Sequence, residues 1–431
     1  MTLKKLNAVL VGAGNRGCTY ADYALECPNE LAIIAVVEPN ELRRKQACER
    51  YNVPEKNAFS SLETFLQENL TCDFVINATM DELHYETARE IMLAGYNMLL
   101  EKPIVADEAQ LLELQKIALE KQVKVNICHV LRYTPFFKTI KTLIDKGVIG
   151  KIMTMELNEH VWIAHFLDSY VRGKWNRKEK CGSGFLLAKS CHDTDLMCWL
   201  NNTTRPKKVF SFGSRSQFIP ANAPEEATEF CYNCPHNEKC LYSAQKVHLE
   251  FDSMPFQTWS ELNKPLSKIT LQEKEDYLKY SDYGRCAYNS GGDINDRQCV
   301  SVEFENGSIA SFTMLGGSSK AGRSIHICGT EGEIEGFVED GFFLLRTMDR
   351  SEGVFQYIEK KIDVSKDVHI SAEYGGHAGG DYAIMYELVR YFNGDNSSVS
   401  ITNINDSING HRVVYAAEKS VELGQCVSLN D

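Results

Sequence analysis

The sequence of 431 residues predicts an α/β protein whose two domains are built on different kinds of sheet. Over residues 1–128, short apolar runs alternate with amphipathic stretches, which is typical of parallel βαβ units. From residue 151 onward, strand-like runs dominate, which indicates an α+β domain with a large, mostly antiparallel sheet. We therefore expect a first domain over 1–128 and a second domain over 129–431.

The elements of the first domain follow from the positions of these runs. Apolar runs predict strands at 6–11, 32–37, 73–78, 97–100 and 123–128. The stretches between them predict helices at 17–27, 40–51, 61–69, 82–94 and 107–121. Asp107 is suited to cap the last helix, because its carboxylate can accept hydrogen bonds from the free N–H groups of the first turn.

In the second domain, helices are expected at 134–146, 191–200, 381–392 and 406–423. Strands are expected at 151–161, 207–216, 298–305, 308–316, 323–328, 332–336 and 341–347. Asn306-Gly307 is a hairpin signal between two of these strands. Residues 217–290 are polar, irregular and rich in cysteine, and we expect them to form an excursion from this domain.

A glycine-rich turn follows the first strand and opens a helix, with the sequence Gly12-Ala13-Gly14-Asn15-Arg16-Gly17. Gly12 permits the tight turn, Gly14 lets backbone N–H groups approach a pyrophosphate, and Gly17 lets the helix lie close to the strand. In this setting, the turn predicts a Rossmann dinucleotide-binding domain in which Asn15 and Arg16 also contact the cofactor. A glycine-rich turn in another kind of α/β domain is the alternative.

The second strand ends in Glu38, about 20 residues after the last glycine, where a carboxylate can bind both ribose hydroxyls of NAD. Arg43 or Arg44 can instead accept a 2′-phosphate, so NADP stays open. The third strand ends near Thr79, at the same crevice. His84 follows at a helix start, where we expect it to position cofactor or substrate.

The composition excludes several classes of function. A net charge of −13 argues against general binding of nucleic acids or anionic membranes. No apolar run approaches the ~20 residues of a membrane-spanning helix, and the first strand begins too early to leave a signal peptide. The 15 cysteines are scattered through a long chain, so we expect mostly reduced thiols and a cytoplasmic protein.

The fourth strand ends in Glu101-Lys102-Pro103. This order places Lys102 over the crevice where a nicotinamide ring would lie, with Glu101 beside the cofactor. A cation there can polarise a carbinol oxygen and stabilise alkoxide character while hydride leaves. The alternative is a lysine that caps an exposed strand end.

The glycine turn and Glu101-Lys102-Pro103 together resemble the Gfo/Idh/MocA oxidoreductases, the group of glucose–fructose oxidoreductase and inositol dehydrogenase. Further matching segments lie at 129–133, 147–151, 192–200 and 379–381. The resemblance implies NAD(P)-dependent oxidation or reduction of sugars, polyols and related small molecules. It also implies that the second sheet is open and serves as an oligomer surface, so we expect a homodimer or homotetramer.

The resemblance implies that Lys102 is the catalytic lysine and that His192 exchanges a proton with the substrate hydroxyl. The family's aspartate four residues before this histidine is Ala188 here, so the usual carboxylate partner is missing. Asp193 or Asp195 can orient His192 instead, and Lys189 is expected to contact an acidic or phosphorylated part of the substrate. A helix-start histidine bonded to backbone is the alternative for His192.

Further substrate-binding candidates come from two polar-aromatic segments. Arg132 and Tyr133 leave the last parallel strand near the expected cleft, although Tyr133 could instead pack at the domain joint. His165, Arg172 and Trp175 should approach the cleft from the second domain, with arginine suited to anionic groups and tryptophan to the apolar face of a sugar. A packed loop with a surface ion pair is the alternative.

Four cysteines of the excursion have the spacing of a metal site. Cys231, Cys234 and Cys240 lie close together, and Cys286 returns from a later segment. This pattern predicts a closed, structural Cys₄ zinc site that tethers a region with little core of its own. An iron–sulfur cluster, free thiols or disulfides are the alternatives, and His236 is an alternative fourth ligand. Typical members of the family lack this insertion.

These observations predict an NAD(P)-dependent oxidoreductase that transfers hydride between a nicotinamide and a sugar, polyol or glycoside. One alternative is a glycosidase that retains NAD while it oxidises, eliminates and reduces again. A second alternative is a non-catalytic regulator that binds a dinucleotide. The identity of the sugar, the carbon and the direction of reaction stay open.

Overall fold

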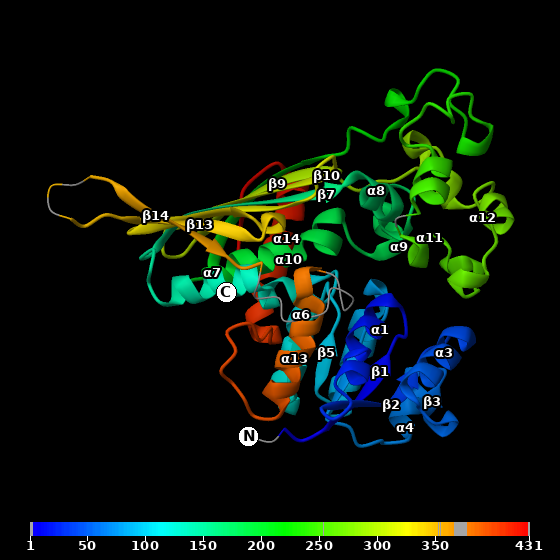
Figure 1. The fold of residues 1–431 in the computed structure, drawn as a ribbon, viewed down its shortest axis with the longest axis horizontal. Helices are drawn as coiled ribbons and strands as arrows, with labels where there is room; N and C mark the ends of the chain where they lie inside the picture. Colours follow the sequence, from blue (N-terminus) through cyan, green and yellow to red (C-terminus); the bar gives the residue numbers. More distant parts are fainter. Residues whose placement is uncertain (1–2, 253, 352, 354, 366–376, 430–431) are drawn as a thin grey trace.

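The computed structural model describes the whole chain except residues 1–2, 253, 352, 354, 366–376 and 430–431. It contains two sheets of six and nine strands, one in each predicted domain (Figure 1). No helix in the described part of the chain is both long and apolar enough to cross a membrane.

The first sheet is parallel throughout, with the order β3-β2-β1-β4-β5-β6. The five predicted strands are present, and the two residues of β3 were not predicted because so short a run carries no pattern. The strands are β1 Leu6–Val11, β2 Leu31–Val37, β3 Ala58–Phe59, β4 Phe74–Asn77, β5 Met98–Leu100 and β6 Val125–Ile127.

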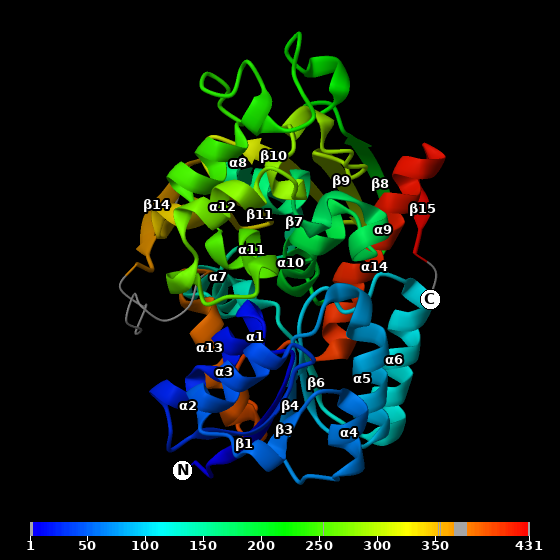
Figure 2. The ribbon, with the colours of Figure 1, turned by 90° about the vertical axis from the view of Figure 1, so that its right-hand side faces the viewer.

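Helices cover both faces of this sheet, as in other doubly wound folds (Figure 2). They are α1 Asn15–Ala21, α2 Tyr23–Glu26, α3 Glu41–Tyr51, α4 Leu62–Gln67, α5 His84–Leu93 and α6 Glu108–Lys121. Asp107 caps α6 as predicted, because its side chain accepts a hydrogen bond from the N–H of Gln110 at 3.0 Å. Helix α13 (Gly380–Phe392) returns to this sheet and buries Ile384 and Leu388 in the same core as β1.

The second sheet has the order β14-β13-β12-β11-β7-β10-β9-β8-β15, and its pairs are antiparallel except β7 with β10. The edge strands β14 and β15 were not predicted, since one is charged and exposed and the other has two residues. The strands are β7 Ile152–Trp162, β8 Pro206–Ser214, β9 Arg297–Phe304, β10 Ile309–Ser318, β11 Gly322–Gly329, β12 Gly332–Phe337, β13 Phe342–Met348, β14 Tyr357–Asp363 and β15 Val427–Ser428.

One face of this sheet is packed and the other is open. Buried and exposed residues alternate along β10, and α7 (Pro135–Asp145), α10 (Phe185–Leu200) and α14 (Ile404–Leu423) lie on the packed face (Figure 1). The prediction that α10 starts at residue 191 is wrong by about two turns. Nearly every residue of α10 is buried, so no side of the helix faces solvent. The sequence therefore lacks the amphipathic pattern from which the first turns of the helix could have been predicted.

The excursion at 217–290 contains only short helices and turns in its described part, and it extends beyond the end of the sheet (Figure 1). Its own core cluster consists of Trp259, Tyr277, Leu278 and Tyr283. The short helices in and before it are α8 Ile163–Phe166, α9 Lys178–Cys181, α11 Pro255–Thr258 and α12 Leu271–Tyr277.

Candidate active site

The glycine turn between β1 and α1 is shaped for a ligand. Gly12 has φ of +87°, and a Cβ there would lie 2.5 Å from the carbonyl oxygen of Ala78. A Cβ on Gly17 would lie 2.1 Å from the carbonyl oxygen of Gly12. A Cβ on Gly14 would meet nothing within 4 Å, so two glycines are needed for packing while the third faces open space that suits a pyrophosphate.

Glu38 lies at the end of β2, directly beside this turn. One carboxylate oxygen accepts a hydrogen bond from the N–H of Ala13 at 2.9 Å, and the other accepts one from the N–H of Asn40. Arg44 donates to the backbone carbonyl of Glu38 at 2.6 Å, whereas Arg43 is exposed. An acidic acceptor and an open glycine turn therefore fit the adenosine ribose and pyrophosphate of a dinucleotide.

Arg16 holds the turn to the rest of the crevice through ion pairs. Its guanidinium donates to Glu101 at 3.0 Å and to Asp381 of α13 at 2.6 Å. Burial opposes ionisation of both acids, yet Arg16 and its neighbours hold the pKa of Glu101 and that of Asp381 below their ordinary values. The ion pair between Arg16 and Glu101 thus fixes the positions of both side chains beside the glycine turn. Asn15 is the first residue of α1 and directly precedes Arg16.

Lys102 reaches across the domain boundary. It follows β5, and its Nζ donates to the carbonyl oxygen of Ala188 in α10 at 2.8 Å. No carboxylate forms an ion pair with this Nζ among the residues that the structure describes. The missing carboxylate at position 188 therefore leaves a backbone carbonyl as the anchor of the lysine, with its positive charge uncompensated by a direct partner.

His192 lies one turn after Ala188 on α10, buried and close to Lys102. Burial, followed by the charge of Lys102, lowers its pKa well below the ordinary value, so the imidazole is neutral near pH 7. Its Nδ1 is buried without a hydrogen-bond partner in the described structure. The alternative of a histidine bonded to backbone through Nδ1 thus has no support in the described residues.

Neither aspartate proposed to orient His192 does so. Asp193 accepts a hydrogen bond from Arg323 of β11 at 2.7 Å, and Asp195 is paired with Arg132. Asp193 is rotated by about 100° from His192 on α10, whereas Asp195 lies on nearly the same face but is held by the guanidinium of Arg132.

Two other imidazole rings lie close to that of His192. The ring of His192 lies 6.2 Å from that of His377 and 5.6 Å from that of His129, measured between centroids. His377 Nδ1 lies 3.2 Å from both carboxylate oxygens of Asp381, which precedes the body of α13. Sequence reasoning missed His377, although its spacing of four residues from Asp381 next to the matching Gly379-Gly380 was a usable signal.

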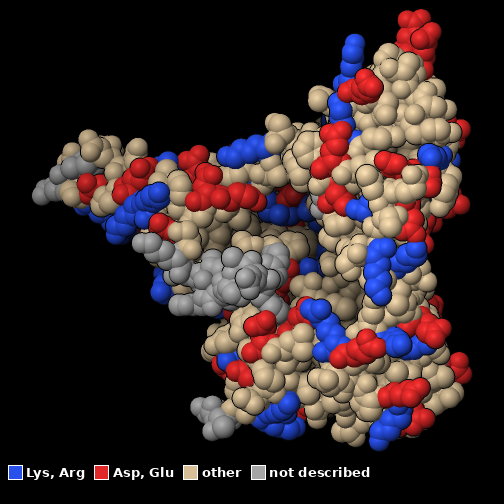
Figure 3. Space-filling view, turned by 45° about the vertical axis from the view of Figure 1, so that its right-hand side comes forward, with Lys and Arg blue, Asp and Glu red and all other residues tan. Residues whose placement is uncertain are grey.

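A cavity of about 240 Å³ lies in the second domain, and its lining residue Lys189 directly follows Ala188, whose carbonyl binds Lys102. Two of the predicted substrate-binding residues, His165 and Lys189, line it together with Trp162, Arg323 and Glu159. The molecule is visibly hollowed between its two parts (Figure 3). Glu159 and Trp162 belong to the polar-aromatic segment that was expected to approach the cleft, although they were not named as candidates, and Arg323 was missed because it lies in an otherwise ordinary strand.

Positively and negatively charged side chains lie next to each other around the cavity. Glu159 lies 3.6 Å from the Nζ of Lys189 and 2.5 Å from a guanidinium nitrogen of Arg323. Burial lowers the pKa of Lys189, and burial together with the charge of Lys189 lowers the pKa of His165 to about 3. The cavity therefore offers charged donors and acceptors side by side, with His165 neutral.

Three predicted substrate contacts are wrong, because the side chains are buried in structural roles. Arg132 is paired with Asp195 and Asp406, and the hydroxyl of Tyr133 contacts Thr402 at 3.2 Å. Packing at the domain joint, the alternative for Tyr133, is thus what the structure shows. Arg172 points into the excursion, where its Nε donates to the carbonyl of Arg285 at 2.8 Å.

The remaining candidates border the cofactor crevice. His84 lies within hydrogen-bond distance of the carbonyls of Pro103 (2.6 Å) and Thr79 (3.1 Å), and so links the loops that follow β5 and β4. The indole N–H of Trp175 donates to Asp81 at 2.9 Å. Trp175 therefore contacts the first domain and does not line the 240 Å³ cavity.

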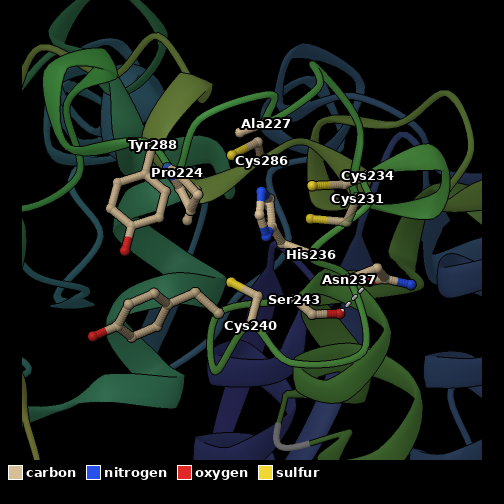
Figure 4. A pocket seen from close by; sticks show the side chains of 12 residues that line it. Pro224, Ala227, Cys231, Cys234, His236, Asn237, Cys240, Ser243, Cys286 and Tyr288 are labelled. Carbon is tan, nitrogen blue, oxygen red and sulfur yellow. Dashed lines mark hydrogen bonds between the residues drawn. The ribbon is translucent and has the colours of Figure 1, made fainter.

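The four cysteines predicted to bind a metal surround one cavity of the excursion, together with His236 (Figure 4). All 15 cysteines of the chain are free thiols in this structure. No three ligand atoms of this group lie within 4.8 Å of one another among the described residues.

Comparisons with known proteins agree with this architecture. The model of the Gfo/Idh/MocA oxidoreductase family, NAD-binding Rossmann fold, matches residues 6–129, and the model of the family's C-terminal alpha/beta domain matches residues 141–429. The putative oxidoreductase YteT of Bacillus subtilis is 25% identical over 331 residues, which cover 73% of this chain and 72% of that protein.

Two solved structures share the fold over almost their full length. An NAD binding oxidoreductase from Klebsiella pneumoniae has a TM-score of 0.70 at 16% identity and covers 99% of this chain and 100% of its own. An inositol dehydrogenase homolog from Azotobacter vinelandii, in complex with NADH and myo-inositol, has a TM-score of 0.68 at 14% identity, with coverage of 99% and 98%. The chain belongs to the Gfo/Idh/MocA family and is an NAD-binding oxidoreductase.

Proposed function

We propose that this oxidoreductase transfers hydride between NAD and a hydroxyl-bearing carbon of a sugar, polyol or glycoside. The observation that carries the proposal is the contact between Lys102 and the carbonyl of Ala188, one helical turn before His192. It brings a cation from the first domain and a neutral base from the second to the same place beside the cofactor crevice.

Each residue of the crevice has a separate task in this proposal. Glu38 holds the adenosine ribose, and the open turn at Gly14 receives the pyrophosphate. Thr79, held by His84, borders the nicotinamide end, and Trp175 limits the access of water there. When bound, NAD supplies the hydride acceptor, or the hydride donor in the reverse direction.

Lys102 and His192 act on the substrate oxygen. The ammonium group of Lys102 stabilises negative charge on that oxygen as its proton leaves. His192 is neutral near pH 7 and can take this proton, and in reduction it returns it. His377, beside His192 and fixed by Asp381, is the group through which the proton can pass to solvent.

The cavity favours a polyhydroxylated substrate. Every hydroxyl both donates and accepts hydrogen bonds, which matches the neighbouring Lys189, Arg323 and Glu159. The partly exposed indole of Trp162 offers an apolar surface to a sugar ring. An acidic group on the substrate would lie beside Lys189, as predicted from the sequence.

We infer that NAD is preferred to NADP. The carboxylate of Glu38 would repel a 2′-phosphate, and the guanidinium of Arg44 is already engaged with the carbonyls of Glu38 and Pro39. Of these two arginines, the exposed Arg43 is the one that could approach such a phosphate.

The test is a screen of polyols, sugar acids and glycosides for absorbance change at 340 nm with NAD and with NADP. We expect at least one polyhydroxylated compound to reduce NAD, with a kcat/KM at least tenfold above that with NADP. The absence of nucleotide turnover and of glycoside cleavage across the panel, from enzyme that binds NADH, would contradict the proposal.

An NAD-retaining glycosidase is the second candidate, because His192 and His377 place two imidazoles at the site. Elimination and re-addition need more than one proton-transfer group, whereas a simple oxidation needs one. In the same screen, cleavage of a glycoside without net absorbance change at 340 nm would favour this candidate. Because the chain belongs to an oxidoreductase family, we do not favour the alternative of a non-catalytic regulator.

We also infer a homo-oligomer that forms through the open face of the second sheet, in the cytoplasm. Alternate residues along much of strands β9 and β10 are exposed on that face, and they include small or polar side chains such as Ser301, Ser311 and Thr313. Light scattering coupled to size exclusion should give the mass of a dimer or tetramer. A mass near 48.7 kDa, that of one chain, would contradict this inference.

A further inference from the structure

The thiol cavity (Cys231, Cys234, Cys240 and Cys286) is organised by backbone pairing between segments far apart in the sequence. Phe230 and Arg285 form an antiparallel bridge, and the N–H of Cys286 donates to the carbonyl of Glu229 at 2.8 Å. Cys231 and Cys286 directly follow the bridged residues. The fold therefore brings the fourth cysteine next to the first one without help from a disulfide.

The other two thiols are brought in by a tight loop. The N–H of Cys234 donates to the carbonyl of Cys231 at 3.1 Å, and the N–H of Cys240 donates to that of His236 at 2.8 Å. All four cysteines then border one small cavity (Figure 4). Its volume is about 20 Å³, which is room for one water-sized or ion-sized species.

A buried positive charge next to this cavity lacks a counter-ion. Arg172 is 1% exposed, and it forms no ion pair with a carboxylate in the part of the chain that the structure describes. Its Nη2 donates to the carbonyl of Tyr242 and lies 3.8 Å from the Sγ of Cys231, while its Nη1 is buried without a hydrogen-bond partner. A buried charge without a counter-ion is strongly destabilising. We therefore expect an anionic group beside Cys231 that compensates the charge of this guanidinium.

We propose that the four cysteines bind one zinc ion as thiolates. Zinc with four thiolates carries a formal charge of −2, which supplies the counter-ion that Arg172 lacks. The single-ion volume of the cavity favours zinc over a multi-iron cluster. Zn–S bonds of about 2.3 Å place the sulfurs ~3.8 Å apart, so the ion draws the thiols together from their wider spacing in this structure.

His236 is a fifth donor at the cavity, and it keeps a separate role. Its Nε2 donates to the carbonyl of Glu225 at 2.7 Å, which ties the loop of Cys234 and Cys240 to the preceding segment. Because four thiolates complete a tetrahedral site, His236 supports the loop and does not bind the ion.

The zinc centre has a consequence for the cofactor crevice. Arg172 lies three residues before Trp175, whose indole contacts Asp81 of the first domain. A second contact joins the excursion to the first domain, where Asn40 donates to Asn263 at 3.1 Å. With a small core of its own, the excursion depends on the ion to hold both contacts in place.

The test is the metal content of the purified full-length chain, measured by mass spectrometry of the elements together with acid-labile sulfide. We expect about one zinc per chain, retained in Cys299→Ser, a matched change of an exposed cysteine on β9, and in His236→Ala. Cys240→Ser and Cys286→Ser should each lose most of the zinc. Iron with sulfide, or a metal-free chain that takes up no added zinc, would overturn the proposal.

A second measurement uses the unmutated chain, so that it does not depend on a variant that folds. Blocking the thiols with an organomercurial should release one zinc, detected with a chromogenic chelator. Removal of zinc should abolish hydrogen-exchange protection over 229–241 and weaken NADH binding by about tenfold, as expected for the loss of two hydrogen bonds. Unchanged protection in the zinc-free chain would contradict the structural role.

Discussion

The two sides of the active site differ in how their residues are assembled. On the side of the first domain, the glycine turn, Glu38 and Lys102 each lie at the carboxyl end of a parallel strand. On the side of the second domain, Lys189, Arg323 and His377 come from a helix, a strand and a loop that are far apart in the sequence. The first side is fixed by local motifs, and the second by tertiary packing alone.

The largest effect is expected from Lys102→Ala, which removes the side chain of the first domain that we propose acts on the substrate oxygen. Turnover should fall by about 10³-fold, since one group that stabilises developing charge is worth about 10²–10³ in kcat and its anchor to α10 is lost as well. NADH affinity should change little, because Glu38 and the glycine turn hold most of the cofactor.

Steady-state kinetics and an NADH titration of the same preparation test this prediction. Lys102→Met is the matched control for side-chain volume and should be equally slow. Wild-type turnover in either variant would remove the lysine from the mechanism.

Packing on the second side can be tested at Arg132, which joins Asp195 of α10 to Asp406 of α14. Arg132→Leu should lower the free energy of unfolding by about 3–5 kcal/mol, because Asp195 would be left buried with only the neutral imidazole of His129 at 3.6 Å beside it among the described contacts. The double variant Arg132→Leu with Asp195→Leu should recover part of the loss. Denaturant unfolding measures both, and an undisturbed Arg132→Leu protein would show that the pair contributes nothing.

The pH dependence of oxidation reports on His192. Because its pKa in the folded protein is lowered, the imidazole stays neutral at pH values where a free histidine would be protonated. The value of kcat/KM should therefore stay level as the pH falls through 6.5 and decline only at lower pH. A decline centred at or above pH 6.5 would contradict the neutral, desolvated base.

The smallest effect is expected at Trp175, a residue of the second domain whose indole contacts Asp81 of the first domain. Trp175→Phe removes the hydrogen bond to Asp81 but keeps most of the aromatic volume. NADH affinity should weaken by about two- to tenfold, in line with about 0.5–1.5 kcal/mol for one hydrogen bond. A loss greater than 100-fold would mean that Trp175 contacts the cofactor directly.

The same contrast explains what the sequence could predict. The parallel strands, Glu38 and Lys102 followed from short motifs whose physical reasons are local. Arg132 and Arg172 were assigned to substrate because an arginine in a polar-aromatic segment looks the same whether its partner is a ligand or a buried group of the protein. The partners Asp406 and Arg285 are distant in sequence, so only the folded chain reveals them.

His377 and Trp162 were missed for the related reason that a single residue outside a motif carries no periodic signal. Their roles depend on neighbours brought by α10 and β11, which the sequence does not pair. The first turns of α10 were also missed, because burial on all sides removes the amphipathic pattern that marks a surface helix.

Binding of a nicotinamide dinucleotide over the glycine turn can be tested by titrating the wild-type chain and Gly14→Val with NADH. A Cβ at position 14 would meet nothing within 4 Å, so we expect the variant to fold with an unchanged melting temperature. It would fill the space for the pyrophosphate, and we expect NADH affinity to fall by about 100-fold or more. Equal affinity in both proteins, or a wild-type chain that binds no NADH, would contradict the account.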